Sequence, residues 1–300
     1  MTDVIVVGDA DTDLFVEVPR LPTWDEGVLA TRVLERPGGK GANTAAALSR
    51  LGVNTGFFGC VGDDRYGQIA RAALEAQGVD TSHLFTIPGG NTYWCIILLD
   101  PSGEKAIVVV KTDTIYPSPA LIRDHIAYFR SARHVHAIGL EPEKVVDALR
   151  IARQAGCTTS VDLDSARAGL SASEALIKMA TFVLVNEQGA CSLLGKDHWF
   201  SGLGHLHSMG PEVIVVTRGR RGAVGFDGHN LVHVPSFSVA VKDTTGAGDC
   251  FSAAFIAGHL RGWGLERTLL FASAAAALST REIGGQTALP DEEEVSLLLA

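Results

Sequence analysis

The chain has 300 residues, of which 46% are hydrophobic and 20% charged, an ordinary composition for one large folded domain with room for a small appendage. The 34 acidic residues outnumber the 25 basic ones, and the formal charge of −9 disfavours nucleic acid as a partner. The five cysteines form no Cys-x-x-Cys pair and no stretch reaches 18 apolar residues, so we expect a cytoplasmic protein with free thiols and no membrane span.

The chain opens on an apolar run at residues 4–7, without the basic and apolar regions of a signal peptide. From there, short apolar runs alternate with helical patterns. The predicted strands cover residues 4–7, 55–58, 134–138, 158–162, 182–185 and 213–217. The predicted helices cover residues 42–51, 64–77, 143–155, 247–260 and 265–278. This order predicts an α/β fold, with a doubly wound, mostly parallel sheet and helices on both faces.

Two segments interrupt this alternation. Residues 14–33 contain short alternating stretches, and residues 92–99 and 105–110 flank Asp100-Pro101-Ser102-Gly103, a turn sequence that predicts a hairpin. We interpret both segments as a small inserted β-sheet that lies over the ligand-binding edge as a lid. The alternative is that they extend the main sheet. The predicted lid comprises residues 13–35 and 90–112, and the predicted core residues 1–12, 36–89 and 113–300.

The sequence Asp243-Thr244-Thr245-Gly246-Ala247-Gly248-Asp249 leads into the helix predicted at 247–260. Its two glycines allow successive backbone N–H groups to point at one spot, where they and the helix N-terminus form an anion hole. Asp249 would repel a bound phosphate unless it accepts the proton of a hydroxyl that attacks phosphorus. The alternative is that Asp249 only complements the helix dipole. We predict phosphoryl transfer, with Asp249 as general base.

Other nucleotide-binding loops do not match. A P-loop needs Gly-x4-Gly-Lys-Ser/Thr, but Leu34 stands in the first glycine position and Gly41 follows Lys40. The dinucleotide fingerprint fails after Gly8, and in the later motif Phe251 stands where its third glycine is due. A nicotinamide-dependent oxidoreductase is therefore disfavoured.

A second cluster, Pro37-Gly38-Gly39-Lys40-Gly41-Ala42-Asn43, opens the first predicted helix, and Asp11 and Asp13 follow the first strand. Two later strands are followed by further carboxylates: Glu141, Asp162 and Asp164. In a parallel sheet these residues meet at the carboxyl ends of the strands. Carboxylates and amides accept hydrogen bonds from sugar hydroxyls, whereas an anionic substrate would call for arginine forks. The cluster predicts a neutral polyhydroxyl ligand.

The two motifs together resemble those of the ribokinase-like, or PfkB, carbohydrate kinases, in the same order and over nearly the whole chain. Residues 37–43 are similar to the N-terminal motif of the family, and residues 243–249 are similar to its C-terminal motif. The resemblance implies a doubly wound α/β domain with a β-sheet lid. It also implies ATP and Mg²⁺ as cofactors, a small sugar as substrate and, in some members, K⁺.

The resemblance also implies residue roles. Asp249 is the base, and Gly246, Ala247 and Gly248 form the anion hole. The positions that hold the sugar correspond to Asp13, Gly39, Lys40, Asn43 and Glu141. Asp11 and Gly38 belong to the same clusters, and we assign them to the sugar as well.

The nucleotide side follows from the same resemblance. Asn186 and Glu187 match a region near the phosphates and magnesium, and Glu187 is our assignment for Mg²⁺. The adenine-side loop corresponds to Thr217, Gly219 and Gly222. Asp243 and Thr245, with the loop at 284–285, match a monovalent cation site, and we also assign Thr245 to the nucleotide.

The chain departs from the family pattern at two places. The usual Asn-x-x-Glu sequence ends here in Gly189, which is why Glu187 is assigned to magnesium. Ribokinase itself has asparagine where this chain has Asp11, and Asp162 and Asp164 differ from its usual residues. These differences favour a ketose or another polyol over ribose.

Two alternative functions stay open. A nucleoside kinase of the same superfamily would need an aromatic slot for a base, which Phe15, Trp24 and Trp94 would supply. A sugar or nucleotide sensor without catalysis is favoured only by Gly189. Because the lid leaves a strand edge open, we also predict a homodimer through the lid.

Several reactive side chains are given structural interpretations. The pairs His134/His136 and His205/His207 lack other ligands at zinc spacing, so we expect core or solvated histidines. Cys250 follows Asp249 without an evident base and is expected to be a buried thiol. Lys111, after the hairpin, either reaches the sugar or faces water.

Overall fold

The computed structural model describes residues 2–101, 105–112, 114–163, 169–195 and 199–300. Three residues that the sequence analysis singled out lie outside this range, namely Asp164 and the turn residues Ser102 and Gly103. Within the described residues, no helix is both long and apolar enough to cross a membrane.

The described chain forms one large sheet in the order β13-β12-β11-β10-β9-β8-β1-β4-β5. Its strands are β1 (Val4–Val7), β4 (Thr55–Gly62), β5 (Asp80–Ile87), β8 (His134–Ile138), β9 (Thr158–Asp162), β10 (Phe182–Asn186), β11 (Val213–Thr217), β12 (Ala223–Phe226) and β13 (Leu231–Val234). All neighbours are parallel except at one edge, where β12 and β13 run antiparallel. Strand β1 is fully buried, because helices cover both faces of the sheet.

The alternation of side chains along β1 shows the two helical layers. Val4 and Val6 pack with one layer, and Ile5 and Val7 pack with the other. The first layer contains α1 (Lys40–Arg50), α2 (Arg65–Ala76), α9 (Ala247–Leu260), α10 (Leu265–Ser279) and α11 (Glu292–Leu299). The second contains α3 (Pro119–Asp124), α4 (Ile126–Arg130), α5 (Pro142–Gln154), α6 (Gly169–Met179), α7 (Glu187–Leu194) and α8 (Leu203–Ser208). The predicted doubly wound fold is confirmed.

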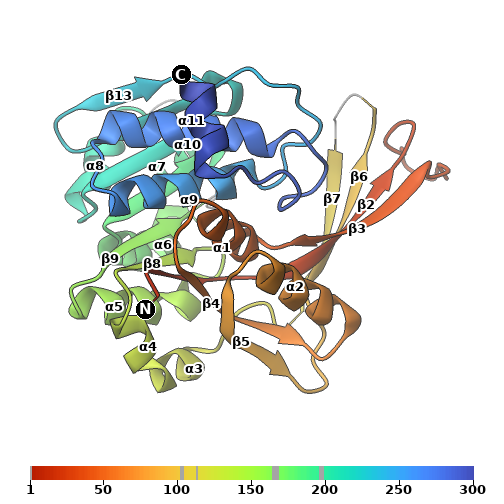
Figure 1. The fold of residues 1–300 in the computed structure, drawn as a ribbon, viewed down its shortest axis with the longest axis horizontal. Coiled ribbons are helices and arrows are strands. Elements are labelled where there is room, and N and C mark those ends of the chain that lie inside the picture. The colour runs from red at the N-terminus through yellow and green to blue at the C-terminus, as the bar shows by residue number, and fades with distance from the viewer. Residues whose placement is uncertain (1, 102–104, 113, 164–168, 196–198) are drawn as a thin grey trace.

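A second, smaller sheet projects from one side of the molecule, to the right in Figure 1. Its order is β3 (Arg32–Gly38), β2 (Asp11–Glu17), β6 (Trp94–Leu99) and β7 (Lys105–Val110). Strands β2 and β6 are parallel, and the other pairs are antiparallel. The two inserted segments therefore form a separate sheet and do not extend the main one. It begins at Asp11 and reaches Gly38, slightly beyond the predicted bounds of the lid.

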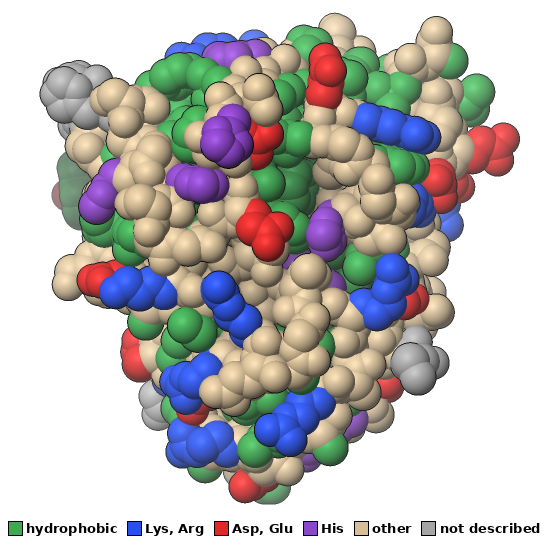
Figure 2. Space-filling view, turned by 90° about the vertical axis from the view of Figure 1, so that its left-hand side faces the viewer, with side chains coloured by type: hydrophobic (Ala, Val, Ile, Leu, Met, Phe, Trp, Pro, Cys, Tyr) green, Lys and Arg blue, Asp and Glu red, His purple; other side chains and the backbone are tan. Residues whose placement is uncertain are grey.

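Figure 2 shows the face of the molecule that lies on the left in Figure 1, away from the small sheet. Basic side chains lie mostly in its lower half and are separated by neutral side chains, and histidines lie mainly in its upper half. No continuous basic stripe crosses this face, in keeping with the acidic composition of the chain.

Candidate active site

A cavity of about 780 Å³ lies between the small sheet and the carboxyl ends of the main strands. Most residues that the sequence assigned to the site line it: Asp11, Asp13, Gly39, Lys40, Asn43, Asn186, Thr217, Gly219, Gly222, Thr245, Gly246, Ala247, Gly248 and Asp249. Four others are not in its wall: Gly38, Glu141, Glu187 and Asp243. The topology brings these segments together because parallel strands end at one edge of the sheet.

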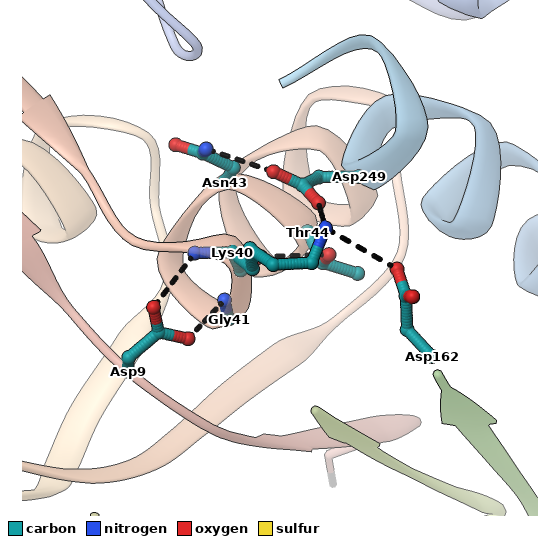
Figure 3. A network of polar contacts seen from close by, with 7 residues as sticks. All are labelled: Asp9, Lys40, Gly41, Asn43, Thr44, Asp162 and Asp249. Carbon is teal, nitrogen blue, oxygen red and sulfur yellow. Dashed lines mark hydrogen bonds and ion pairs between the residues drawn. The ribbon is translucent and has the colours of Figure 1, made fainter. Parts of the chain in front are cut away.

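Asp249 joins the two sequence motifs. Its carboxylate is 3% exposed, in the first turn of α9. It accepts a hydrogen bond of 2.7 Å from Lys40 Nζ and one of 2.9 Å from Asn43 Nδ2 (Figure 3). Lys40 Nζ also lies 3.6 Å from a carboxylate oxygen of Asp162, at the end of β9. Two side chains from α1 thus fix a buried carboxylate at the start of α9, an arrangement that complementing a helix dipole does not require.

The glycine-containing loop that was predicted to form an anion hole lies where α9 begins. Gly246 is the N-cap residue, with φ 77°, and a Cβ at this position would lie 2.7 Å from Gly285 Cα. Only glycine fits both the conformation and the space. The first N–H groups of a helix have no acceptor within it; Ala247 N donates to Thr244 O at 3.3 Å, so the N–H groups of Gly248 and Asp249 are the ones that could face an anion.

Asp243 braces this loop from behind. Its carboxylate accepts hydrogen bonds from Thr245 N (3.0 Å), Thr245 Oγ1 (2.8 Å) and Gly284 N (3.0 Å). Lys105, from β7, places Nζ 3.0 Å from Thr245 Oγ1 and 3.5 Å from a carboxylate oxygen of Asp243. A lid cation therefore lies beside the anion hole. The sequence analysis did not identify Lys105, because a lysine at the start of a hairpin strand carries no signal of its own.

The other end of the cavity is acidic. Asp9, which the sequence analysis also missed, is 2% exposed and accepts the N–H groups of Lys40 (3.2 Å) and Gly41 (3.1 Å). It thereby holds the N-terminus of α1 in place (Figure 3). Burial is the largest cause of the raised pKa values of Asp9, Asp11 and Asp13, and for Asp13 the pKa is about 7.

Gly38 allows these carboxylates to approach the chain closely. A Cβ on Gly38 would lie 2.2 Å from Asp11 Oδ1 and 2.5 Å from Asp13 Oδ2. Because it has no side chain, Gly38 leaves room for the two carboxylates of the acidic end, although it does not itself line the cavity.

The sequence pattern of the pfkB family carbohydrate kinases matches residues 1–292. The chain belongs to this family. It is 33% identical to a ribokinase of Bacillus subtilis (strain 168) over 301 residues, with 100% of both chains covered. It is 32% identical to an ATP-dependent ribose-1-phosphate kinase of Halopiger xanaduensis, with 100% of this chain and 99% of the relative covered.

The fold agrees with this assignment. A structure of Arabidopsis thaliana ribokinase complexed with ribose and ATP superposes with a TM-score of 0.88, at 27% identity, covering 100% of this chain and 99% of that chain. The predicted family and the predicted enzyme class, an ATP-dependent sugar kinase, are confirmed.

Two carboxylates of this kinase lie in ion pairs outside the cavity wall. Glu141 pairs with Lys111 at 2.6 Å and with Lys144 at 2.7 Å, and the Lys111 side chain is 66% exposed. Glu187 pairs with Arg218 at 3.4 Å and with Arg221. The sequence placed both glutamates at the correct strand ends, but Lys111, Arg218 and Arg221, with which they pair, come from other parts of the fold.

The three aromatic residues that were considered for a base slot, Phe15, Trp24 and Trp94, do not line the cavity. Phe15 is fully buried in the core, and Trp24 is fully exposed. Trp94 stacks on Tyr66, with ring centroids 5.5 Å apart. The lid instead lines the cavity with aliphatic residues, among them Ile97, Ile107 and Val109.

Several reactive side chains of the kinase are structural, as expected. His134 Nε2 and His136 Nδ1 each lie 2.7 Å from Ser160 Oγ, and both histidines are fully buried. Burial lowers the pKa of His136 to about 3, so this ring is neutral. Cys250 is fully buried, which raises the pKa of its thiol to about 12 and makes it a poor nucleophile.

Proposed function

We propose that this kinase transfers the γ-phosphoryl group of ATP to a hydroxyl of a small neutral sugar, ribose-like or ketohexose-like, with Asp249 as general base. The observation that carries the proposal is the position of Asp249. Its carboxylate lies between an acidic, polar end of the cavity and the Gly246-Ala247-Gly248 anion hole. A hydroxyl held at the acidic end loses its proton to Asp249 while the phosphoryl group moves along the anion hole.

The acidic end favours a sugar without phosphate. Asp9, Asp11, Asp13 and Asp162 line it, and Lys40 is engaged by Asp249 and Asp162. An anionic group placed there would meet carboxylates, and no arginine is among the described residues that line this end. Asn43 adds an amide to the same end, and Gln286 Nε2 donates to its Oδ1 at 3.1 Å. We therefore assign the sugar to Asp11, Asp13, Gly39, Lys40 and Asn43, with Gly38 and Glu141 supporting from outside the cavity wall.

The nucleotide end is built from loops of the large sheet. We assign the nucleotide to Asn186, Thr217, Gly219, Gly222 and Thr245, all of which line the cavity. Lys105 adds a positive charge at the anion hole. Magnesium arrives with the phosphates and keeps several of its waters, so the protein needs to supply few ligands. We assign this task to Glu187, which follows the cavity residue Asn186 and must share its carboxylate with Arg218 and Arg221.

A monovalent cation is proposed at Asp243. Its carboxylate is 4% exposed and lies between Thr245 and Gly284, behind the anion hole. The three hydrogen bonds and the nearby Lys105 already compensate part of its charge. Comparison of kcat in K⁺ and in a large organic cation tests whether K⁺ adds to this compensation.

The substrate assignment predicts the outcome of a panel assay. Purified protein with ATP and Mg²⁺ is expected to release ADP with a neutral pentose or ketohexose, and not with ribose 1-phosphate or adenosine. ADP release is measured for each compound with and without K⁺. Turnover restricted to ribose 1-phosphate would contradict the neutral-sugar assignment, and turnover restricted to adenosine would favour the nucleoside kinase. Binding of ATP and sugar without any ADP release would favour a sensor.

We also propose a homodimer through the lid. Val33 on β3 and Val108 on β7 are 55% and 53% exposed, and both strands are open edges of the small sheet. Light scattering is expected to give a dimer mass for the wild-type protein and a monomer mass for Val108→Asp, because a buried carboxylate opposes pairing. The control is Leu297→Asp on α11, which is 70% exposed and lies in the large domain. A monomeric wild-type protein at micromolar concentration would refute the dimer.

A cytoplasmic location is proposed from the thiols. All five cysteines are free, and three of them, Cys60, Cys95 and Cys250, are buried. Free thiols persist in a reducing compartment.

A further inference from the structure

Two carboxylates at the acidic end of the cavity point to the same spot. Asp11 and Asp13 are separated by one residue on β2, so their side chains share one face of the strand. They are 2% and 5% exposed. One oxygen of each and the Cys95 sulfur all lie within 4.8 Å of one another. Asp11 Oδ1 is buried and has no hydrogen-bond partner.

The surroundings of this pair are mostly negative or neutral. Asp9, Asp243 and Asp249 add three further carboxylates, Tyr93 just before β6 adds a hydroxyl, and Cys95 on β6 adds a thiol. The lysines of the cavity have other contacts. Lys40 donates to Asp249 at 2.7 Å, and Lys105 lies 3.0 Å from Thr245 Oγ1.

Two carboxylates so close together and so deeply buried do not both ionise near neutral pH, and such a pair titrates in two coupled steps. Burial and the charge of Asp13 hold the pKa of Asp11 well above its ordinary range. The pKa of Asp13 is about 7, because of burial and the neighbouring carboxylates, with an opposing effect of Lys105.

We propose that Asp11 is protonated in the working site and donates a hydrogen bond to a hydroxyl of the neutral sugar, with ionised Asp13 as the acceptor beside it. The inference rests on the proposed function, which places the sugar at this end of the cavity. Asp11 Oδ1 is packed against Gly38, outside the cavity wall, and no group of the described residues donates a hydrogen bond to it, which favours the neutral carboxyl.

A protonated carboxyl offers one O–H donor and one carbonyl acceptor, which is the pattern that an amide also offers. The protonated Asp11 then donates a hydrogen bond to the oxygen of a sugar hydroxyl, and the ionised Asp13 accepts a hydrogen bond from a hydroxyl proton. Two ionised carboxylates would offer acceptors only. Recognition of the sugar therefore requires the proton on Asp11, and it weakens when that proton is lost at high pH.

The same proton affects stability. The pKa of each carboxyl is higher in the folded protein than in the unfolded chain, so the folded protein binds more protons between the two values. Stability from this pair is present at low pH and is lost as pH rises through the folded pKa values. Asp11→Asn keeps the donor and removes the titration, so the variant is expected to lose this part of the pH dependence.

The test uses sugar binding and direct titration on the full chain. Calorimetry without ATP starts at about pH 7.5, where Asp13 with its pKa of about 7 is mostly ionised, and the wild-type Kd for the panel's sugar is expected to rise about 10-fold between there and about pH 9, one decade for the loss of one required proton over a pH unit. Asp11→Asn is expected to bind that sugar within about threefold of wild type at about pH 7.5, with a flat profile above it. Its thermal midpoint is expected to fall less than that of wild type over the same range.

Carbon NMR of labelled aspartate in the ligand-free protein provides a measurement that needs no activity. One carboxyl signal, assigned by its absence in Asp11→Asn, is expected to keep its protonated shift at pH 7. A signal that titrates near the ordinary aspartate value of about 3.9 would overturn the proposal. If Asp11→Asn does not fold, Asp13→Asn assigns the pair instead, by lowering the pKa of Asp11. Failure of the kinase assay alone would refute the proposed function and leave this titration standing.

Discussion

Replacing Asp249 by asparagine is expected to lower kcat by about 100-fold or more while ATP and sugar still bind. The variant keeps the size of the side chain but removes the base that accepts the hydroxyl proton. It also places an amide where Lys40 and Asn43 now donate to a carboxylate. ADP release at saturating substrates measures kcat, and calorimetry measures the binding of each substrate separately.

The control for Asp249→Asn is Asp147→Asn on α5. Asp147 is 7% exposed and pairs with Arg123 and Arg150, far from the cavity wall. Asp147→Asn also removes the charge of a buried, ion-paired carboxylate. This variant is therefore expected to lose stability and to keep its kcat. Full turnover by Asp249→Asn would show that another group is the base.

Gly246→Ala is expected to lower kcat by at least about 100-fold, the scale of a lost oxyanion-hole donor. The methyl group would lie 2.7 Å from Gly285 Cα, so the loop or its neighbour has to move, and the N–H groups at the start of α9 move with it. The left-handed conformation adds a cost of about 1–2 kcal/mol to stability. Steady-state kinetics and thermal unfolding measure the two effects.

Gly262→Ala separates these effects. Gly262, just after α9, has φ 72°, close to the 77° of Gly246, but a Cβ there meets nothing within 4 Å. The control is expected to lose similar stability from backbone strain and to keep its activity. Equal loss of kcat in both variants would mean that strain in α9, and not the anion hole, explains the effect.

The predicted strands are confirmed where apolar runs are continuous. Residues 134–138, 158–162 and 213–217 were placed with the observed bounds, and these strands are almost entirely buried even where β8 and β9 contain histidine, threonine or serine. Strand β5 at one edge of the large sheet, and strands β12 and β13 at the other end, were missed. In β5, exposed and half-buried residues dominate, so it carries no apolar run to recognise.

Two of the helices that were not predicted, α11 and α7, carry capping signals in the sequence. Helix α11 begins with a capping box in which Asp291 and Glu294 bond each other's backbone N–H groups, and this Asp-x-x-Glu signal is present in the sequence. Helix α7 is capped by Asn186, whose side chain accepts Gly189 N at 2.7 Å. Its residues had been interpreted only as a nucleotide motif, so the cap was overlooked.

By itself, the sequence determined the family, the doubly wound sheet and the two glycine-containing motifs, because these depend on local patterns of apolar residues and glycine. The tertiary structure alone decided which charged groups meet. Asp249 contacts Lys40 and Asn43, which lie more than 200 positions earlier. Glu141 and Glu187 form ion pairs with basic residues outside the cavity wall. The ion pairs that a long side chain forms depend on the charged groups within its reach. Folding brings most of those groups together from distant parts of the chain.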